Sequence, residues 1–247
     1  MKARLFRRLF LIQGLWNYRT LLGPGMLWAL LPLLRSEYRN DAEALEAALE
    51  RHSGLFNAHP YLAGFAAGAL ARMEVDREPG SMIQRFREVI RGPLGSLGDR
   101  FFWAAWLPTT ILLAGAAGLM GLPAPLTIFL FLGVYNAAHL VVRWQGLEAG
   151  WIHGRGVAEG LARMGLPDHA ERTGRGGVML LGLVLGWVVV RALDPDLMHT
   201  GTAILLVGSG GFLFVAGILR GRESTGWPPA FILFVIVALF GWGWISG

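Results

Sequence analysis

The chain has 247 residues, of which 54% are hydrophobic and 16% are charged, with a formal net charge of +5 and no cysteine. Its mean hydropathy of +0.48 exceeds that of soluble globular domains and indicates a bilayer protein. The absence of cysteine excludes disulfides and thiolate chemistry. Lys2 is the only lysine, and most arginines fall in the first hundred residues. Basic clusters beside apolar segments indicate a cytoplasmic face with anionic lipid rather than a nucleic-acid partner.

The first stretch, MKARLFRRLFLIQG, has the basic start of a signal peptide. Arginines interrupt its apolar part, however, and no small-residue cleavage site follows closely, so we expect it to remain in the mature protein. Its alternation of basic and apolar residues predicts a helix in the membrane interface, with its apolar side toward the lipid. The alternative is an ordinary helix packed on the core.

Residues 40–54, NDAEALEAALERHSG, have the pattern of a short surface helix. Asn40 or Asp41 is the expected N-cap, acidic residues fill the first turns, and Arg51 and His52 fall in the last. Leu45, Leu49 and His52 share one face, which is the side expected to pack, and the charges are interpreted as a solvated face.

The next segment, LFNAHPYLAGFAAGALARME, places Asn57 and His59 immediately before a helix rich in small residues. Small residues allow another backbone to approach closely in a membrane. The two polar side chains have two interpretations. They cap the helix start, or they offer donors and acceptors to a hydroxylated ligand in a pocket shielded from water.

Residues 92–99, GPLGSLGD, combine glycines, a proline and Asp99 directly before an apolar run. The stretch lacks the Lys and Ser/Thr of a phosphate-binding loop and the strand context of a dinucleotide site, and we expect no cofactor or metal. A broken helix with an embedded carboxylate is typical of transporter substrate sites. A solvent-exposed N-cap for a helix starting near Phe101 is the alternative.

Apolar stretches of roughly membrane-spanning length recur in the second half of the chain. They comprise residues 103–120, 122–142, 178–193, 202–219 and 227–245. We therefore predict an all-α, polytopic helical membrane protein with interfacial N-terminal helices and a glycine-broken, re-entrant or discontinuous helix. Residues 1–100 are expected to form an interfacial and core half, and residues 101–247 a transmembrane helical bundle.

Three segments in order, LIQGLWNYRTLLGPGMLWALLPLL, FNAHPYLAG and GPLGSLGDRFFW, resemble motifs of the membrane IID component of mannose/fructose/sorbose-type sugar phosphotransferase systems (PTS). The resemblance runs from about residue 10 to 108 and continues weakly through residues 136–154. It implies a multi-pass protein of the cytoplasmic membrane that assembles with a IIC membrane subunit and is served by soluble IIA and IIB phosphocarriers. It implies no phosphocarrier residue on the IID chain, so none of the six histidines is assigned phosphohistidine chemistry.

The resemblance also assigns residues to the path of a hexose-type sugar. The pathway or substrate-binding residues that it implies are Gln13, Asn17, Asn57, His59, Asp99 and Arg143, and the structural loop comprises Gly92, Pro93, Gly95 and Gly98. Glu74 matches a glutamate that ends the helix after the second motif.

Several positions depart from the family pattern, notably Arg19, Arg100 and Leu107. These departures leave open a transport-deficient regulatory or scaffold subunit. The rival from another class is an intramembrane protease that uses Ser209 with a histidine base. That interpretation is weaker because Val207 stands where a serine-protease glycine is expected, and small residues in a membrane segment already suit helix packing.

Overall fold

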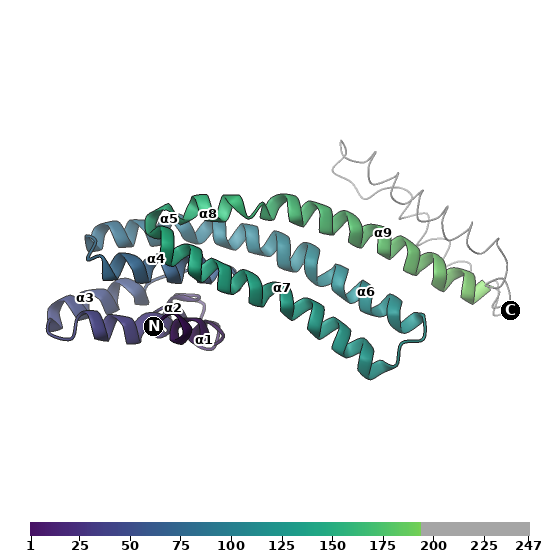
Figure 1. Cartoon of the computed structure of the whole chain (residues 1–247), viewed down its shortest axis with the longest axis horizontal. Helices are drawn as coiled ribbons and strands as arrows, with labels where there is room; N and C mark the ends of the chain where they lie inside the picture. Colours follow the sequence, from purple (N-terminus) through teal and green to yellow (C-terminus); the bar gives the residue numbers. More distant parts are fainter. Residues whose placement is uncertain (194–247) are drawn as a thin grey trace. The chain divides into compact units, whose positions relative to one another are not determined.

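A computed structural model of the chain describes residues 1–193 and shows an all-helical fold, as predicted (Figure 1). Within these residues the only strand-like features are two isolated bridges, Asn17 to Leu21 and Leu21 to Phe56. Ser209 and the last two predicted apolar stretches lie outside the described residues. The helices are α1 (Lys2–Leu9), α2 (Gly23–Glu37), α3 (Ala42–Ser53), α4 (Ala63–Val75), α5 (Gly80–Gly98), the π-helical η1 (Asp99–Trp106), α6 (Leu107–Leu119), α7 (Ala124–His153), the 3-10 turn η2 (Gly154–Gly156), α8 (Val157–Arg163) and α9 (Leu166–Leu193).

The backbone contacts divide the chain into two compact units. The first unit comprises Met1–Leu107 and Leu132–Glu171, and the described part of the second comprises Pro108–Phe131 and Arg172–Leu193. All the residues that the sequence assigned to the substrate path or its loop lie in the first unit.

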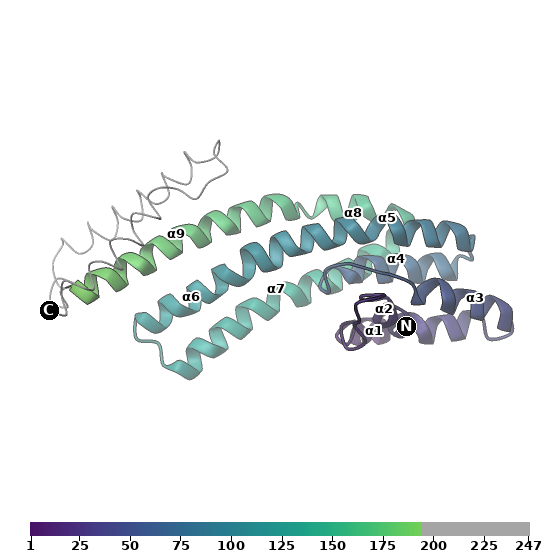
Figure 2. The ribbon, with the colours of Figure 1, turned by 180° about the vertical axis from the view of Figure 1, so that it is seen from behind.

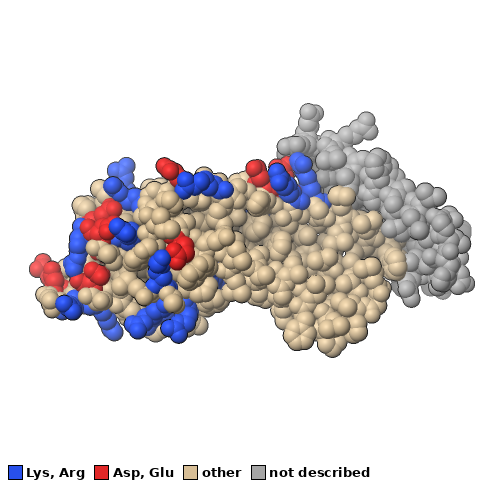
Figure 3. Space-filling view, in the orientation of Figure 1, with Lys and Arg blue, Asp and Glu red and all other residues tan. Residues whose placement is uncertain are grey.

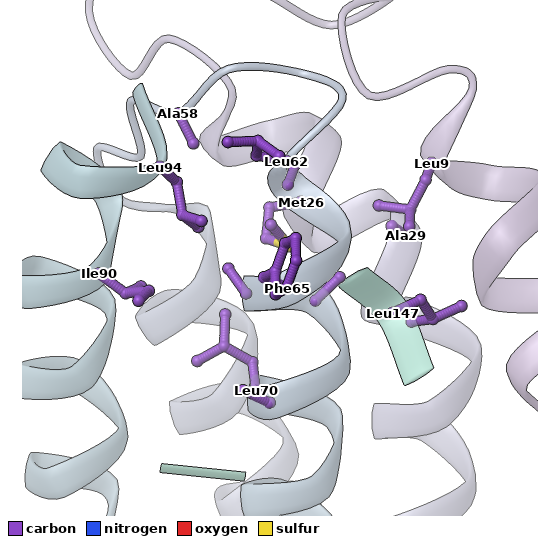
Figure 4. Close-up of a cluster of buried hydrophobic side chains, with 14 of the residues drawn as sticks. Leu9, Met26, Ala29, Ala58, Leu62, Phe65, Leu70, Ile90, Leu94 and Leu147 are labelled. Carbon is purple, nitrogen blue, oxygen red and sulfur yellow. The ribbon is translucent and has the colours of Figure 1, made fainter. Parts of the chain in front are cut away.

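Helix α4 occupies the centre of the first unit. Its Phe65 is fully buried and lies among Met26 of α2, Leu94 of α5 and Leu147 of α7 (Figure 4). The small residues of α4 bring α7 close, because a Cβ on Gly68 would lie 2.3 Å from the carbonyl oxygen of Leu147. This confirms the expectation that another backbone packs against the small-residue helix.

Helix α1 is amphipathic, but its apolar side faces the protein. Leu5, Leu9 and Ile12 are at most 4% exposed and belong to the core, whereas Arg4 and Arg7 are exposed. The prediction that the apolar side of α1 faces lipid is therefore wrong. The apolar stripe instead packs on neighbouring helices, as the alternative interpretation of a helix packed on the core predicted.

Helix α3 begins as predicted, because the Asp41 side chain accepts a hydrogen bond from the backbone N–H of Ala44 at 2.9 Å. The acidic side chains of α3 are exposed, as expected for a solvated face. Arg51 and His52 differ, since both turn inward toward α4.

The glycine-rich stretch does not break the helix. Residues 92–98 are part of α5, with Pro93 inside it, and at Asp99 the helix passes into η1 and then α6 (Figure 2). The expected discontinuity is thus absent, and Asp99 is not an N-cap either. The local change at Asp99 is a wider helical winding, which accommodates an irregularity without ending the helix.

Two helical stretches in the described part of the chain are long and apolar enough to cross a membrane: residues 80–119 and 124–188. Only 22% and 11% of their most apolar windows are buried, unlike the core helices of a soluble protein. Residues 101–142 contain no Asp, Glu, Lys or Arg, and the surface over α6 and the first turns of α7 is correspondingly uncharged (Figure 3). This surface suits contact with lipid or with another membrane protein.

Candidate functional site

The loop between α3 and α4 carries the second sequence motif and lies against the first. Leu22 donates a backbone hydrogen bond to the Phe56 carbonyl at 2.9 Å, and Phe56 donates one to Thr20 at 3.1 Å. Asn17 stabilises the segment at Thr20, because its Oδ1 accepts from the N–H of Thr20 at 2.9 Å and its amide donates to the Thr20 hydroxyl at 2.8 Å. Asn17 therefore supports the loop that carries Asn57 and His59.

His59 is buried at the start of α4, where only 1% of its surface is exposed. Its ring stacks on Phe102 at 5.2 Å between centroids and meets the edges of Tyr61 and Trp103 at 5.0 Å. Nδ1 accepts a hydrogen bond from the Tyr61 N–H at 3.2 Å, and Nε2 has no hydrogen-bond partner within residues 1–193. Burial, and then the charge of Arg143, lower the pKa of His59 to about 4. The neutral ring thus carries its proton on Nε2 as a buried, unused donor.

Gly98 explains why the third motif packs against the second. A Cβ at Gly98 would lie 2.2 Å from the Cβ of His59, which no real contact allows. Gly92 has open space around it, and a Cβ on Gly95 would make only an ordinary contact of 3.8 Å with the Asn57 carbonyl oxygen. Gly98 is required for close approach of α5 to His59, and not for a turn of the chain.

The polar interior continues from His59 to α7. Tyr61 stacks on His139 at 4.4 Å, and its hydroxyl lies 3.1 Å from that of Tyr135. The guanidinium of Arg143 lies over Tyr61 at 5.2 Å and donates to the Leu9 carbonyl. We call these five residues, His59, Tyr61, Tyr135, His139 and Arg143, the His59 cluster. In residues 1–193 no carboxylate pairs with Arg143, so the cluster holds a cation without a protein counter-charge.

The other predicted path residues do not join this cluster. Gln13, Asn57 and Asp99 are exposed on the surface of the chain. The side chain of Asn17 makes its hydrogen bonds within its own turn, to Thr20. Of the predicted path residues, His59 and Arg143 lie in the cluster, and Tyr61, Tyr135 and His139 were not among those predicted. Tyr61 follows His59 by two residues, and Tyr135, His139 and Arg143 recur at four-residue spacing on one face of α7, which is the signal that could have found them.

A second buried polar group, which we call the Glu74 cluster, joins α2, α3 and α4. Glu74 is fully buried and accepts hydrogen bonds from the Tyr38 hydroxyl at 2.6 Å, from Arg51 at 2.9 Å and from His52 Nε2 at 2.7 Å. Burial alone would raise the pKa of Glu74, but the bonds from His52 and Tyr38 and the charge of Arg51 outweigh it and hold that pKa at about 2. Burial also raises the pKa of Tyr38 to about 12 and lowers that of His52.

Arg87 of α5 fixes the end of α3 below the loop. Its side chain is 1% exposed and donates to the carbonyl oxygens of Arg51 at 2.6 Å, His52 at 3.1 Å and Gly54 at 3.2 Å. These are carbonyls that a helix end leaves without backbone partners. Arg87 and the Glu74 cluster therefore hold α3, and with it the loop at residues 54–62, in a defined position.

Comparison with known families identifies the family to which the chain belongs. The model of the "PTS system mannose/fructose/sorbose family IID component" family matches residues 1–203, which is most of the chain. The chain belongs to this IID family. It is 28% identical over 192 residues to the mannose-specific EIID component of Escherichia coli K12, covering 75% of this chain and 67% of the relative. It is also 28% identical to the sorbose-specific EIID component of Klebsiella pneumoniae and to the fructose permease IID component of Bacillus subtilis, in each case covering 75% of this chain and 69% of the relative.

The fold of this IID component also occurs in solved structures. A chain in the cryo-EM structure of the mannose transporter ManYZ with microcin E492 is similar, with a TM-score of 0.59 and 22% identity, covering 98% of this chain and 95% of that one. A second structure, described as a membrane protein, gives a TM-score of 0.68 at 22% identity, with the same coverage. The chain is therefore a membrane component of a PTS sugar transporter of the mannose and sorbose type, and the sequence resemblance is confirmed.

Proposed function

We propose that this IID component forms, together with a IIC membrane subunit, the translocation path for a hexose-type sugar that a IIB protein phosphorylates during uptake. IIB would in turn receive its phosphoryl group from IIA. The proposal places the protein in the cytoplasmic membrane as a multi-pass subunit of a hetero-oligomer. The observation that carries it is the unused Nε2–H donor of His59, which is buried among aromatic rings.

The chemistry of the His59 cluster suits a sugar. Aromatic rings pack against the apolar C–H faces of a pyranose, and a donor shielded from water discriminates hydroxyl groups strongly. His59 offers such a donor between Phe102 and Trp103, and Trp103 is 53% exposed, so one side of this aromatic group reaches the surface of the chain.

The exposed position of Asp99, Asn57 and Gln13 suits a path that lies between two subunits. A carboxylate in a membrane-spanning helix is unfavourable beside lipid and is usually turned toward a protein partner or a hydrated cavity. Asp99 lies one residue after Gly98, which packs on His59. The polar surface around Asp99 would therefore complete a sugar site only when IIC covers it.

The test is sugar uptake by cells that produce this protein with its IIC, IIB and IIA partners and lack other hexose systems. We expect His59→Phe to lower the initial rate of hexose uptake at least tenfold, while the amount of IIC that copurifies is unchanged. The exposed His169→Gln is the matched control and should retain the parent rate. Uptake by His59→Phe at the parent rate would contradict the role of the cluster.

The Asp99→Asn variant tests the role of Asp99 independently of that of His59. If Asp99 contributes to a shared path, uptake falls while assembly persists, and Asp76→Asn on the exposed end of α4 has no effect. An unchanged rate in Asp99→Asn rejects its part in the path. If the unmodified protein binds IIC in a fixed ratio and no hexose is taken up, the regulatory or scaffold interpretation replaces transport.

A further inference from the structure

A groove runs between α1 and α2 on the surface of the first unit. It has a volume of about 260 Å³. The residues that line it are Met1, Arg4, Leu5, Ala29, Pro32, Leu33 and Ser36. Its floor is apolar, because Leu5, Ala29 and Leu33 belong to the buried core, and its rim carries the exposed guanidinium of Arg4. A groove with apolar walls and a cationic rim matches an amphiphile with an anionic head.

The position of α1 beside this groove is fixed by Arg8. Pro32 lacks an N–H, so the carbonyl of Trp28 one turn earlier has no helical donor. Arg8 supplies the donor at 2.6 Å and places its guanidinium 3.9 Å from the centre of the Trp28 ring. Lys2 pairs with Glu148 at 2.8 Å. Lys2 and Arg8 therefore anchor α1 to the protein, and Arg4 and Arg7 remain exposed.

The segment that forms the groove is mainly positive, although Glu148 pairs with Lys2 and Glu37 follows the lining residue Ser36. The chain has no acidic residue before Glu37, whereas this segment contains Lys2 and five arginines. Figure 3 shows the corresponding concentration of Lys and Arg over the N-terminal region. Such a segment attracts the anionic phosphodiesters of the cytoplasmic leaflet.

The residues that follow α1 have exposed side chains that suit contact with lipid headgroups. Leu11, Leu15, Trp16 and Tyr18 are 45–90% exposed, and Trp16 and Tyr18 meet edge to face at 4.7 Å. Exposed tryptophan and tyrosine beside basic residues are typical of the boundary between lipid tails and headgroups. A group of exposed apolar side chains such as this one usually marks a surface that contacts a membrane or a protein.

We propose that the groove between α1 and α2 is a binding site for an anionic phospholipid. Arg4 pairs with the phosphodiester, and an acyl chain lies along Met1 and Pro32 above the apolar floor of the groove. The site is independent of the sugar path, and the bound lipid would fix the N-terminal helix pair at the cytoplasmic face of the membrane.

The test is native mass spectrometry of the full-length protein in neutral detergent, titrated with phosphatidylglycerol or with phosphatidylcholine. We expect tighter binding of phosphatidylglycerol and, for Arg4→Gln, about fivefold weaker binding of that lipid. Arg7→Gln is the matched control, since Arg7 is exposed on the same helix but does not line the groove. Equal losses in both variants would show diffuse charge attraction and overturn the proposal.

Two further measurements are needed. One tests the shape of the groove independently of its charge, and the other tests whether the site binds lipid or free phosphate. Ser36→Phe fills the groove from its exposed rim without a change in charge, and we expect it to weaken phosphatidylglycerol binding while the thermal midpoint stays near the parent value. A variant that binds lipid as the parent does would refute the acyl-chain contact. Inorganic phosphate at millimolar concentration should not displace the lipid, and its displacement would show that the site recognises phosphate alone.

Discussion

The Glu74 cluster and the His59 cluster both place polar side chains inside the first unit, but they differ in how charge is balanced. Glu74 accepts hydrogen bonds from three side chains and is paired with Arg51. The His59 cluster contains Arg143 and two histidines and leaves His59 Nε2, His139 Nδ1 and Arg143 Nε without hydrogen-bond partners in the described residues, whereas the Glu74 cluster leaves only His52 Nδ1 without one. Buried polar groups that satisfy each other stabilise a fold, whereas unsatisfied ones are retained where a ligand or partner supplies the missing contact. The comparison therefore supports a structural role for the Glu74 cluster and the proposed ligand-binding role for the His59 cluster.

Removal of the carboxylate from the Glu74 cluster should have the largest effect on stability. Glu74→Ala leaves Tyr38, Arg51 and His52 without their common acceptor, and we expect a loss of about 3–5 kcal/mol because breaking one side of a buried ion pair isolates the other. The measurement is the thermal midpoint of the purified protein in detergent. Glu50→Ala, on the exposed face of α3, should leave the midpoint nearly unchanged. Similar midpoints for the two variants would contradict the structural role of Glu74.

The pH dependence of stability should distinguish the contribution of His59 from that of Glu74. The pKa of His59 falls from 6.5 to about 4 on folding, so between these values the unfolded chain binds more protons. The contribution of His59 to the free energy of unfolding is fully present above pH 6.5. It decreases as the pH falls toward 4, by about 3 kcal/mol in all. The pKa of Glu74 falls from 4.5 to about 2, so its contribution persists above pH 4.5 and is lost only below it.

The measurement is the thermal midpoint at pH 7 and pH 5 for the parent and His59→Gln. We expect a smaller drop in the variant, and the remaining drop includes His52, whose pKa burial also lowers. His169→Gln should retain the full drop of the parent. An identical pH response in His59→Gln would mean that His59 is not held neutral by burial.

Alanine at the glycines of α5 should produce the smallest effect and tests the packing of the His59 cluster. Gly98→Ala places a methyl group against His59, and overpacking of this kind is destabilising by about 1–3 kcal/mol. Gly92→Ala meets no neighbour and should be neutral or slightly stabilising, because alanine favours a helix over glycine by about 1 kcal/mol. Thermal midpoints of the two variants provide the measurement. Equal sensitivity at both positions would favour the broken helix that the structure does not contain.

Signals that lie close together in the chain allowed the sequence to predict much of this protein. The apolar stretches and low charge identified a helical membrane protein, and Asp41 marked the start of α3. The three ordered motifs identified the family, and the small residues of α4 predicted a close helix partner. Each of these features depends on composition, periodicity or a cap within a few residues.

The tertiary structure decided how the polar residues are used. The glycines and Pro93 suggested a break, but the helical preference of single residues is worth only about 1–3 kcal/mol and packing against His59 and the core overrides it. The Glu74 cluster joins Tyr38 to a residue 36 positions later, and Tyr61 reaches Tyr135 across 74 positions. The sequence thus determined which segments are helical and which solvent they suit, because these depend on local chemistry. The partner of each buried polar group depends on which helices pack together, and only the folded chain specifies that.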